Sequence, residues 1–165
     1  MSPAPPVGPG GRPFGGWRIP AFVLGLVALG VNAVILLSDR APGLFDKVSM
    51  RIDAGVSRAA NATGVVPAAR LPQSDFDVHL LIWAAAALLL GLAAWSWVAL
   101  ALAGGSVFAL SVVMEVAQQT FTVSRTLQRE DIAGNAVGVL CGVGAVAGFA
   151  VAWRMVSTRL SAPGP

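Results

Sequence analysis

The chain has 165 residues, of which 56% are hydrophobic and 12% are charged, and its formal net charge is +3. Ordinary soluble domains carry about 25% charged residues, so this composition excludes a soluble monomer and also a disordered, collagen-like or coiled-coil chain. One cysteine and one histidine exclude a disulfide framework and a metal site built from cysteines or several imidazoles. Nucleic-acid binding has no support, since no basic cluster with interleaved aromatic residues occurs. No cofactor and no metal are predicted.

The N-terminal 18 residues contain five prolines and five glycines, a composition typical of a disordered tail. The apolar block over about 19–37 follows directly. It is longer than the apolar part of a secretory signal, and the charged pair Asp39-Arg40 behind it is not a signal cleavage site. The block is therefore predicted to be a retained first span, which opens a membrane domain over 19–156 with a short tail at 157–165.

The long loop after the first span contains a helical repeat of apolar residues. Positions every three or four residues are apolar, while charged residues occupy the positions between them; the apolar set is Leu44, Val48, Ile52, Val56 and Ala59. This spacing predicts an amphipathic helix over about 44–60 that lies on the membrane surface or caps the bundle.

Three further apolar blocks complete the predicted membrane domain, at about 78–95, 97–117 and 132–153. Each is long enough to cross a bilayer, which takes about 20 residues of helix. Only Ser96 separates the second span from the third, so the two are predicted to form a tight hairpin with Trp95 and Trp97 at one membrane interface. The predicted fold is an all-α membrane protein, a bundle of four transmembrane helices plus an amphipathic helix in the first loop.

The charge of the two tails indicates how this bundle is oriented. The N-terminal tail carries Arg12 and Arg18, the C-terminal tail carries Arg154 and Arg159, and neither contains an acidic residue. Basic residues close to a span favour the cytoplasmic side. Both termini are therefore predicted to be cytoplasmic, with the first and third loops facing outward.

Polar residues gather at one end of the predicted spans. A charged side chain at the centre of a membrane helix costs roughly 2.5–3.5 kcal/mol on insertion scales. The hairpin brings the start of the second span and the end of the third to one membrane side, where the fourth span also begins. This arrangement predicts an outward-facing polar site between the helices, made of His79, Glu115, Gln118, Gln119, Arg125, Asp131 and Asn135.

Helical spacing places part of this site on one narrow stripe of the fourth span. At about 100° per residue, the stripe contains Asp131, Asn135, Gly138 and Gly142. Glycines on such a stripe let a neighbouring helix approach closely, and the glycines predicted to serve helix packing are Gly134, Gly138 and Gly142. Asp131 and Asn135 are then expected to point into the bundle.

The order of these residues resembles the signature of the VanZ-like family. That pattern reads E-x-x-Q, a short turn with R, then D-x-x-x-N-x-x-G-x-x-x-G. It is matched here by Glu115, Gln118 or Gln119, Arg125, Asp131, Asn135, Gly138 and Gly142. An earlier family motif, roughly D-K-x-x-H, is matched by Asp75 and His79, with Phe76 at its lysine position. The resemblance covers roughly residues 75–145.

The resemblance implies a small, multi-spanning protein of the bacterial plasma membrane with a role in the cell envelope. The founding member of the family is linked to resistance to the glycopeptide antibiotic teicoplanin. Membrane lipids are then the expected partners, a lipid-linked cell-wall precursor or a glycopeptide is a further candidate ligand, and an oligomer is compatible with the pattern.

Site chemistry leaves two main hypotheses open. In the first, the site binds or processes a lipid headgroup or a lipid-linked envelope precursor. The catalytic candidates for proton transfer are His79, Glu115 and Asp131, Arg125 holds a phosphate or carboxylate, and the other ligand-binding candidates are Gln118, Gln119, Asn135 and Asp75. In the second, the protein is non-enzymatic, structural or accessory, and its polar cluster only holds the bundle together. A proton-coupled carrier is less favoured, because four helices enclose little room for alternating access.

Overall fold

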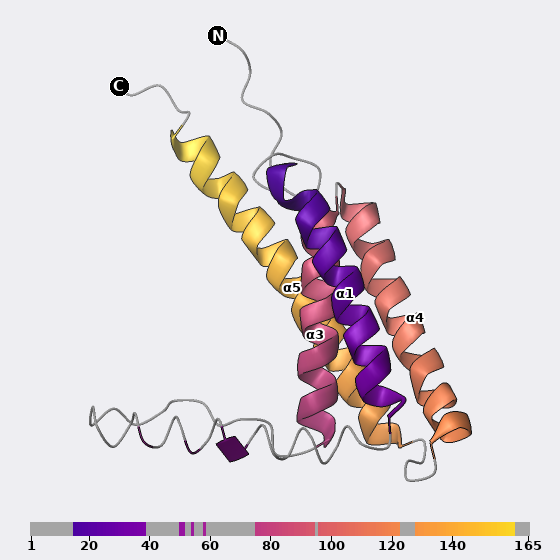
Figure 1. Ribbon diagram of the computed structural model, residues 1–165. Coiled ribbons are helices and arrows are strands. Elements are labelled where there is room, and N and C mark those ends of the chain that lie inside the picture. The colour runs from indigo at the N-terminus through magenta and orange to yellow at the C-terminus, as the bar shows by residue number, and fades with distance from the viewer. Residues whose placement is uncertain are drawn as a thin grey trace.

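The computed structural model describes residues 15–38, 50, 51, 54, 58, 75–94, 96–122 and 128–160. These residues form four long α-helices and one short 3₁₀ helix, and no strand occurs among them (Figure 1). The elements are η1 (Gly15–Trp17), α1 (Arg18–Leu36), α3 (Asp75–Ala93), α4 (Trp97–Phe121) and α5 (Arg129–Leu160). The predicted all-α bundle is confirmed.

All four long helices are long and apolar enough to cross a membrane. Large apolar side chains cover their outer surfaces, and Val34, Leu102 and Leu140 are each exposed over more than half of their area. Contiguous apolar surface of this kind is rare on soluble monomers, whereas in a bilayer it faces lipid chains. The chain is therefore a multi-pass membrane protein.

Each predicted span corresponds to one helix, although the ends differ by several residues. The helix α3 begins at Asp75 rather than near 78, and α4 continues to Phe121 rather than 117. The largest difference is in α5, whose 32 residues correspond to a length of about 48 Å, beyond the roughly 30 Å of a hydrocarbon core. Hydropathy marks only the apolar part of a helix, whereas acidic first turns such as Asp75 and Asp131 are stabilised by the helix dipole.

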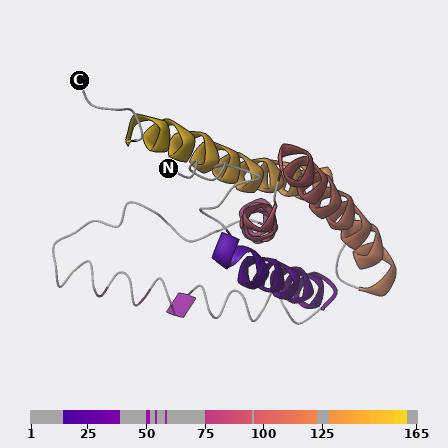
Figure 2. The same ribbon diagram turned by 90° about the horizontal axis from the view of Figure 1, so that it is seen from above.

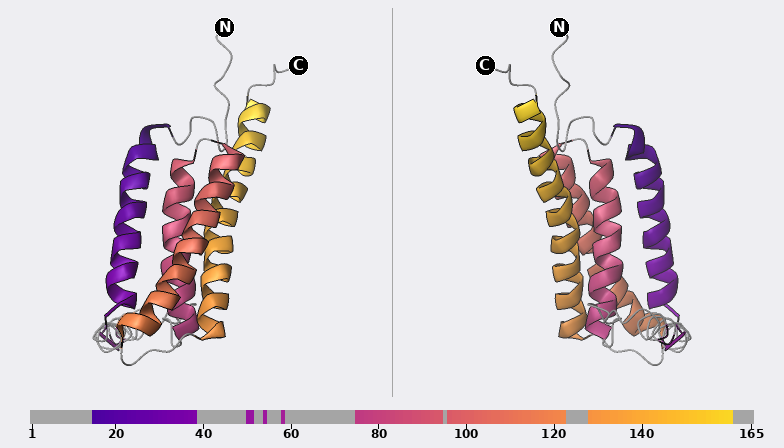
Figure 3. Two further views of the ribbon diagram at one scale, coloured as in Figure 1. Left: turned by 90° about the vertical axis from the view of Figure 1, so that its right-hand side faces the viewer. Right: turned by 90° about the vertical axis from the view of Figure 1, so that its left-hand side faces the viewer.

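The helix α3 lies at the centre of the bundle, and α1, α4 and α5 all pack on it (Figure 2). Its buried residues Trp83, Ala86 and Ala87 form the core together with Leu36 of α1 and Val107 of α4. The chain runs up and down, so the start of α1 and the end of α5 lie at one end of the bundle (Figure 3). The start of α3, the end of α4 and the start of α5 meet at the other end, as the sequence predicts for the polar residues.

The tight hairpin between α3 and α4 is formed by very few residues. Ser96 has an extended backbone at the N-cap of α4, and its hydroxyl oxygen accepts a hydrogen bond of 3.0 Å from the Ala99 amide. A serine cap of this kind stabilises a helix by about 1 kcal/mol. Trp97 begins α4, with the Arg154 guanidinium 5.8 Å from its ring centre, while Trp95 lies outside the described residues.

Most of the predicted amphipathic helix over about 44–60 lies outside the described residues. The four residues described within that range are helical and exposed, namely Met50, Arg51, Ala54 and Arg58. Arg58 Nε donates to the Ala54 carbonyl oxygen at 3.1 Å. Of the predicted tails at 1–18 and 157–165, residues 1–14 and 161–165 are outside the described residues as well. Residues 15–18 and 157–160 are helical, because η1 and α1 begin earlier and α5 ends later than hydropathy indicates.

Candidate functional site

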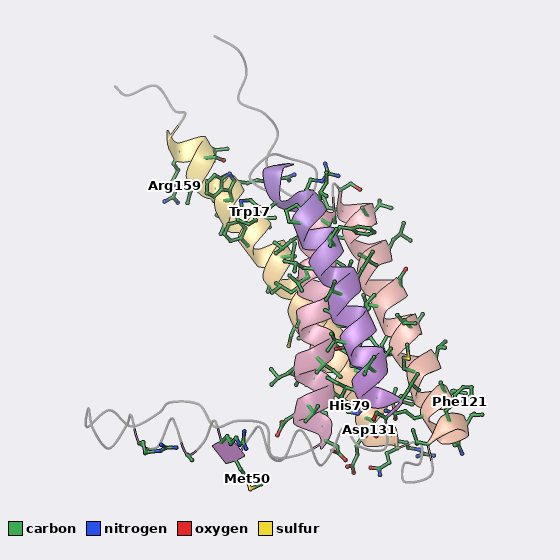
Figure 4. All side chains as sticks on the ribbon, in the orientation of Figure 1. Trp17, Met50, His79, Phe121, Asp131 and Arg159 are labelled. Atoms are coloured by element: carbon green, nitrogen blue, oxygen red, sulfur yellow. The ribbon has the colours of Figure 1, made fainter. Side chains whose placement is uncertain are left out.

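Three of the predicted site residues meet inside the bundle, and we term His79, Glu115 and Asn135 the polar cluster. They come from three different helices, α3, α4 and α5. The exposed fraction is 1% for His79 and 0% for Glu115 and Asn135. Figure 4 shows His79 at the end of the bundle that also contains Phe121 and Asp131. The structure thus brings to one buried point residues that are as many as 56 positions apart.

Three short contacts join the members of the polar cluster. His79 Nδ1 lies 2.9 Å from Asn135 Oδ1 and 3.0 Å from Glu115 Oε1. The Asn135 amide donates through Nδ2 to the same Glu115 Oε1 at 3.0 Å. The carboxylate oxygen of Glu115 therefore links all three helices, and hydrogen bonds to such a charged acceptor contribute about 1.5–3 kcal/mol each.

The partners of the His79 ring assign the position of its proton. Because Asn135 donates through Nδ2 to Glu115, its Oδ1 is the acceptor that faces His79. Both atoms near Nδ1 are acceptors, so a neutral ring carries its proton on Nδ1 and keeps a free lone pair on Nε2. A histidine held in this way by a carboxylate is oriented to accept a proton at Nε2.

Two buried atoms of the polar cluster have no hydrogen-bond partner among the described residues, His79 Nε2 and Glu115 Oε2. Leaving a buried polar atom unpaired costs about 1–3 kcal/mol, and native structures contain few such atoms. The cluster therefore has hydrogen-bonding capacity that its own contacts do not use: one ring nitrogen and one carboxylate oxygen.

The glycine stripe of α5 is what allows the polar cluster to form. A Cβ atom at Gly138 would collide with the backbone oxygen of Leu80 in α3, and one at Gly134 would lie 3.3 Å from His79 Cβ. Gly142 likewise faces backbone atoms of α3. Because no side chain separates the two backbones at these positions, α5 lies close enough to α3 for its asparagine to reach the histidine.

Two other buried amides bind helices together through backbone carbonyl groups. Gln118 Nε2 donates to the carbonyl oxygen of Leu36, the last residue of α1, at 3.0 Å. Carbonyl groups in the last turn of a helix have no partner within that helix, so Gln118 satisfies one of them. Asn32 Nδ2 donates to the carbonyl oxygen of Ile82 at 3.0 Å. These two bonds attach α1 to α4 and to α3.

The remaining predicted site residues lie nearer the surface or outside the described residues. Asp131, in the first turn of α5, is buried with 8% exposure. Asp75 and Gln119 are exposed, so Gln118 is the glutamine of the family-like pattern that lies inside the bundle. Arg125 is not among the described residues.

Sequence reasoning missed the role of two buried polar groups. Asn32 is the single polar side chain within the apolar block of α1, and this isolation was a signal that it points inward. Trp83 lies one helical turn from His79 and is 1% exposed, and its indole nitrogen has no hydrogen-bond partner among the described residues. The sequence does not show whether the indole nitrogen has a partner, because this depends on the side chains that pack around the ring.

The side chains of the site supply proton transfer and hydrogen bonding. Within the described part of the chain, no group of three or more His, Cys, Asp or Glu residues could hold a metal ion. Cys141 is exposed on α5, away from the buried cluster. The chemistry that these residues offer is therefore that of an imidazole, a carboxylate and an amide.

Comparison of the chain with models of known protein families, with curated proteins and with solved structures finds no match. The function must therefore be inferred from the geometry of the polar cluster and from the residue pattern between Glu115 and Gly142. Burial, hydrogen bonding and position at one end of the bundle are the observations that bear on it.

Proposed function

We propose that this chain is a VanZ-like integral membrane protein of the bacterial plasma membrane whose polar cluster binds or processes a lipid headgroup or a lipid-linked cell-envelope precursor. The observation that carries the proposal is a pair of buried atoms, His79 Nε2 and Glu115 Oε2, that have no hydrogen-bond partner in the described part of the chain, within an otherwise hydrogen-bonded cluster. Helices that needed only to be held together would gain more from a fully paired cluster. The resemblance of the residue pattern to the VanZ-like family supports the same function.

The chemistry proposed for the site starts at His79. A hydroxyl or acidic phosphate group of the headgroup donates to Nε2, and Glu115 stabilises the imidazolium that forms when the proton is transferred. Asn135 keeps the ring oriented, because its Oδ1 contacts Nδ1 at 2.9 Å. Asp131 supplies a second carboxylate at the same end of the bundle. In the sequence, Arg125 belongs to the connection between α4 and α5 and is proposed to hold a phosphate or carboxylate group, for which a guanidinium is suited.

The same proposal sets the orientation of the protein in the membrane. Both termini are cytoplasmic, as the acid-free basic tails indicate, and the polar cluster then lies near the outer leaflet. Reporter fusions at Ala60 and at the C-terminus test this arrangement. We expect an exported reporter at Ala60 and a cytoplasmic one at the C-terminus, and the reverse result would contradict the outward placement of the site.

A non-enzymatic structural or accessory role is the second candidate, and one observation favours it. Gln118 and Asn32 are buried polar residues whose side chains each bind the backbone of another helix. If the polar cluster has the same purpose, its members are needed for stability and for nothing else. The two candidates therefore differ in what happens when the charge of the cluster is removed and its shape is kept.

The substitution Glu115→Gln separates the two functions. A glutamine keeps an oxygen that accepts from His79 and Asn135, but it removes the carboxylate charge. We expect the variant to insert and to unfold near the temperature of the natural protein, but to lose the lipid that co-purifies, as measured by native mass spectrometry from lipid nanodiscs. Glu130→Gln is the matched control, since Glu130 is an exposed acid at the same end of the bundle. Equal lipid retention in both variants would support the structural role instead.

Antibiotic resistance is the cellular readout of the proposal. Cells that express the chain are expected to grow at higher concentrations of the glycopeptide teicoplanin than cells that express Glu115→Gln at the same membrane level. If cells with the natural chain and cells with Glu115→Gln grow equally well, although the natural chain binds lipid, lipid binding at the polar cluster does not cause resistance.

A further inference from the structure

A second feature of the bundle lies beside the polar cluster: an apolar groove between α4 and α5. It has a volume of about 320 Å³ and is lined by Gly104, Gly105, Phe108, Ala136, Val139, Leu140 and Val143. Small-molecule sites in proteins span about 300–1,000 Å³, so the groove is large enough for part of a ligand. We term these seven residues the α4–α5 groove.

The groove leads along both helices toward the polar cluster. On α5, its lining residue Ala136 directly follows Asn135 of the cluster. On α4, Phe108 and Glu115 are seven residues apart, which places them on the same helix face two turns apart at about 100° per residue. Figure 3 shows α4 and α5 crossing at an angle, and the two helices are in contact. The groove therefore lies on the same face of α4 as Glu115 and reaches the level of Asn135 along α5, and its lining contains no residue of the polar cluster.

Glycine keeps the groove open. A Cβ atom added at Gly105 would have no atom within 4 Å, although Gly105 lines the groove. The neighbouring Gly104 differs, since a Cβ atom there would lie 2.8 Å from Val143 Cγ2. Gly104 is thus required for packing between the helices, while Gly105 only leaves space.

We propose that the α4–α5 groove holds the hydrocarbon chain of the lipid whose headgroup the polar cluster binds. The inference rests on the proposed function and makes the ligand an amphipathic lipid rather than a soluble headgroup compound. A chain of methylene groups fits a narrow groove, whereas a helix of a second copy is about 10–12 Å wide. A lipid also complements both parts of the site, because an apolar helix would offer no partner to Glu115 Oε2 and His79 Nε2.

Photolabelling in nanodiscs tests the groove. The probe is a long-chain alkyl phosphate with a diazirine at mid-chain, and the labelled peptides are located by mass spectrometry. In the natural protein we expect labels on the groove walls around Phe108 and Leu140. Gly105→Leu fills the groove and is expected to lower this labelling about tenfold, equivalent to losing the burial of about two methylene groups.

The control variant is Gly144→Leu. Gly144 is also a helical glycine with no atom within 4 Å of an added Cβ, but it does not line the groove, so its labelling should stay at the natural level. Ala136→Leu narrows the groove from the α5 side and repeats the test with a second substitution. Equal labelling in the natural protein and in all three variants would mean contact with bulk lipid only, and it would overturn the inference while leaving Glu115-dependent headgroup binding intact.

Two further outcomes distinguish this inference from the proposed function. Glu115→Gln should lower labelling by the alkyl phosphate but not by the corresponding diazirine-bearing alkane. If Gly105→Leu lowers labelling by both probes and Glu115→Gln lowers neither, the link between groove and polar cluster is wrong, and the proposed function with it. Crosslinks between two copies through Leu140, together with no lipid label in the groove, would overturn the inference in favour of an interface between copies.

Discussion

Both halves of α5 contain glycines and polar residues, but most of these residues face neighbouring helices in the first half and most are exposed in the second half. In the first half, Gly138 faces the backbone of α3 and Asn135 is fully buried in the polar cluster. In the second half, an added Cβ at Gly148 would meet nothing within 4 Å, and Arg154 is exposed. Figure 1 shows that the second half leans away from the rest of the bundle. The role of a glycine or a polar residue in this helix is therefore decided by the neighbouring helix it faces.

The largest expected effect on stability comes from replacing one glycine in each half of α5 with alanine, which adds one methyl group. Gly138→Ala places a Cβ atom on the backbone of Leu80, so α3 and α5 must move apart, at a cost of about 3 kcal/mol in the free energy of unfolding. Gly148→Ala has open space and should instead stabilise its helix by about 0.5–1 kcal/mol. Thermal unfolding in detergent micelles measures both changes, and shifts of the same sign would break the distinction between the two halves.

Loss of the cluster amide is expected to have the next largest effect. Asn135→Leu removes the donor to Glu115 Oε1 and the acceptor near His79 Nδ1. The His79–Glu115 contact remains, so we expect the cost of one hydrogen bond to a charged acceptor, about 1.5–3 kcal/mol. In the second half, Thr158→Ala removes exposed hydrogen bonds to the Arg154 and Met155 carbonyl groups and should change stability by less than about 0.5 kcal/mol. Unfolding of both variants under one condition gives the comparison.

The coupling inside the cluster can be measured separately. If Asn135 acts through Glu115, the double variant Asn135→Leu with Glu115→Gln should be less destabilised than the sum of the single variants, by about 0.5–3 kcal/mol. Additive effects would show that Asn135 and Glu115 are independent, contrary to the hydrogen bond between them in the structure.

A further small effect is expected where Arg154 contacts Trp97 at the exposed end of α5. The Arg154 guanidinium lies 5.8 Å from the centre of the Trp97 ring, and cation–π contacts at exposed sites contribute about 0.5–1 kcal/mol. Arg154→Ala should lower stability by no more than this, whereas Arg154→Lys should retain part of it. If Arg154→Ala lowers the free energy of unfolding as much as Asn135→Leu does, this half of α5 is packed far more tightly than its exposure indicates.

Much of the fold could be predicted from the sequence, because membrane spans and a one-residue gap leave visible patterns. The four spans follow from four apolar blocks, and the hairpin follows from Ser96 standing alone between two of them. The same connectivity places His79, Glu115 and Asn135 at one end of the bundle. The ends of the helices were harder to predict, since the acidic first turns of α3 and α5 are polar and hydropathy does not include them.

The candidate site was only partly predictable, because spacing does not identify the atom that each side chain contacts. The sequence left Gln118 and Gln119 as equal choices, and the structure places Gln118 inside, where it donates to the Leu36 carbonyl oxygen. Asn32 was not expected to take part, although it stood alone in an apolar block. The predicted role of Arg125 in holding a phosphate or carboxylate remains a prediction, since Arg125 lies outside the described residues.

By itself, the sequence determined that this is a four-helix membrane protein with its polar residues at one end, since these properties depend on local hydropathy and on the length of the connections. The tertiary structure decided that His79 meets Glu115 and Asn135 at 3.0 Å or less, and which of their atoms find no hydrogen-bond partner among the residues that the structure describes. Helical spacing predicts which face of α5 points inward, but it does not predict which atoms meet there. The close approach of α5 to α3, set by glycines that face backbone atoms, decides those contacts and therefore creates the site.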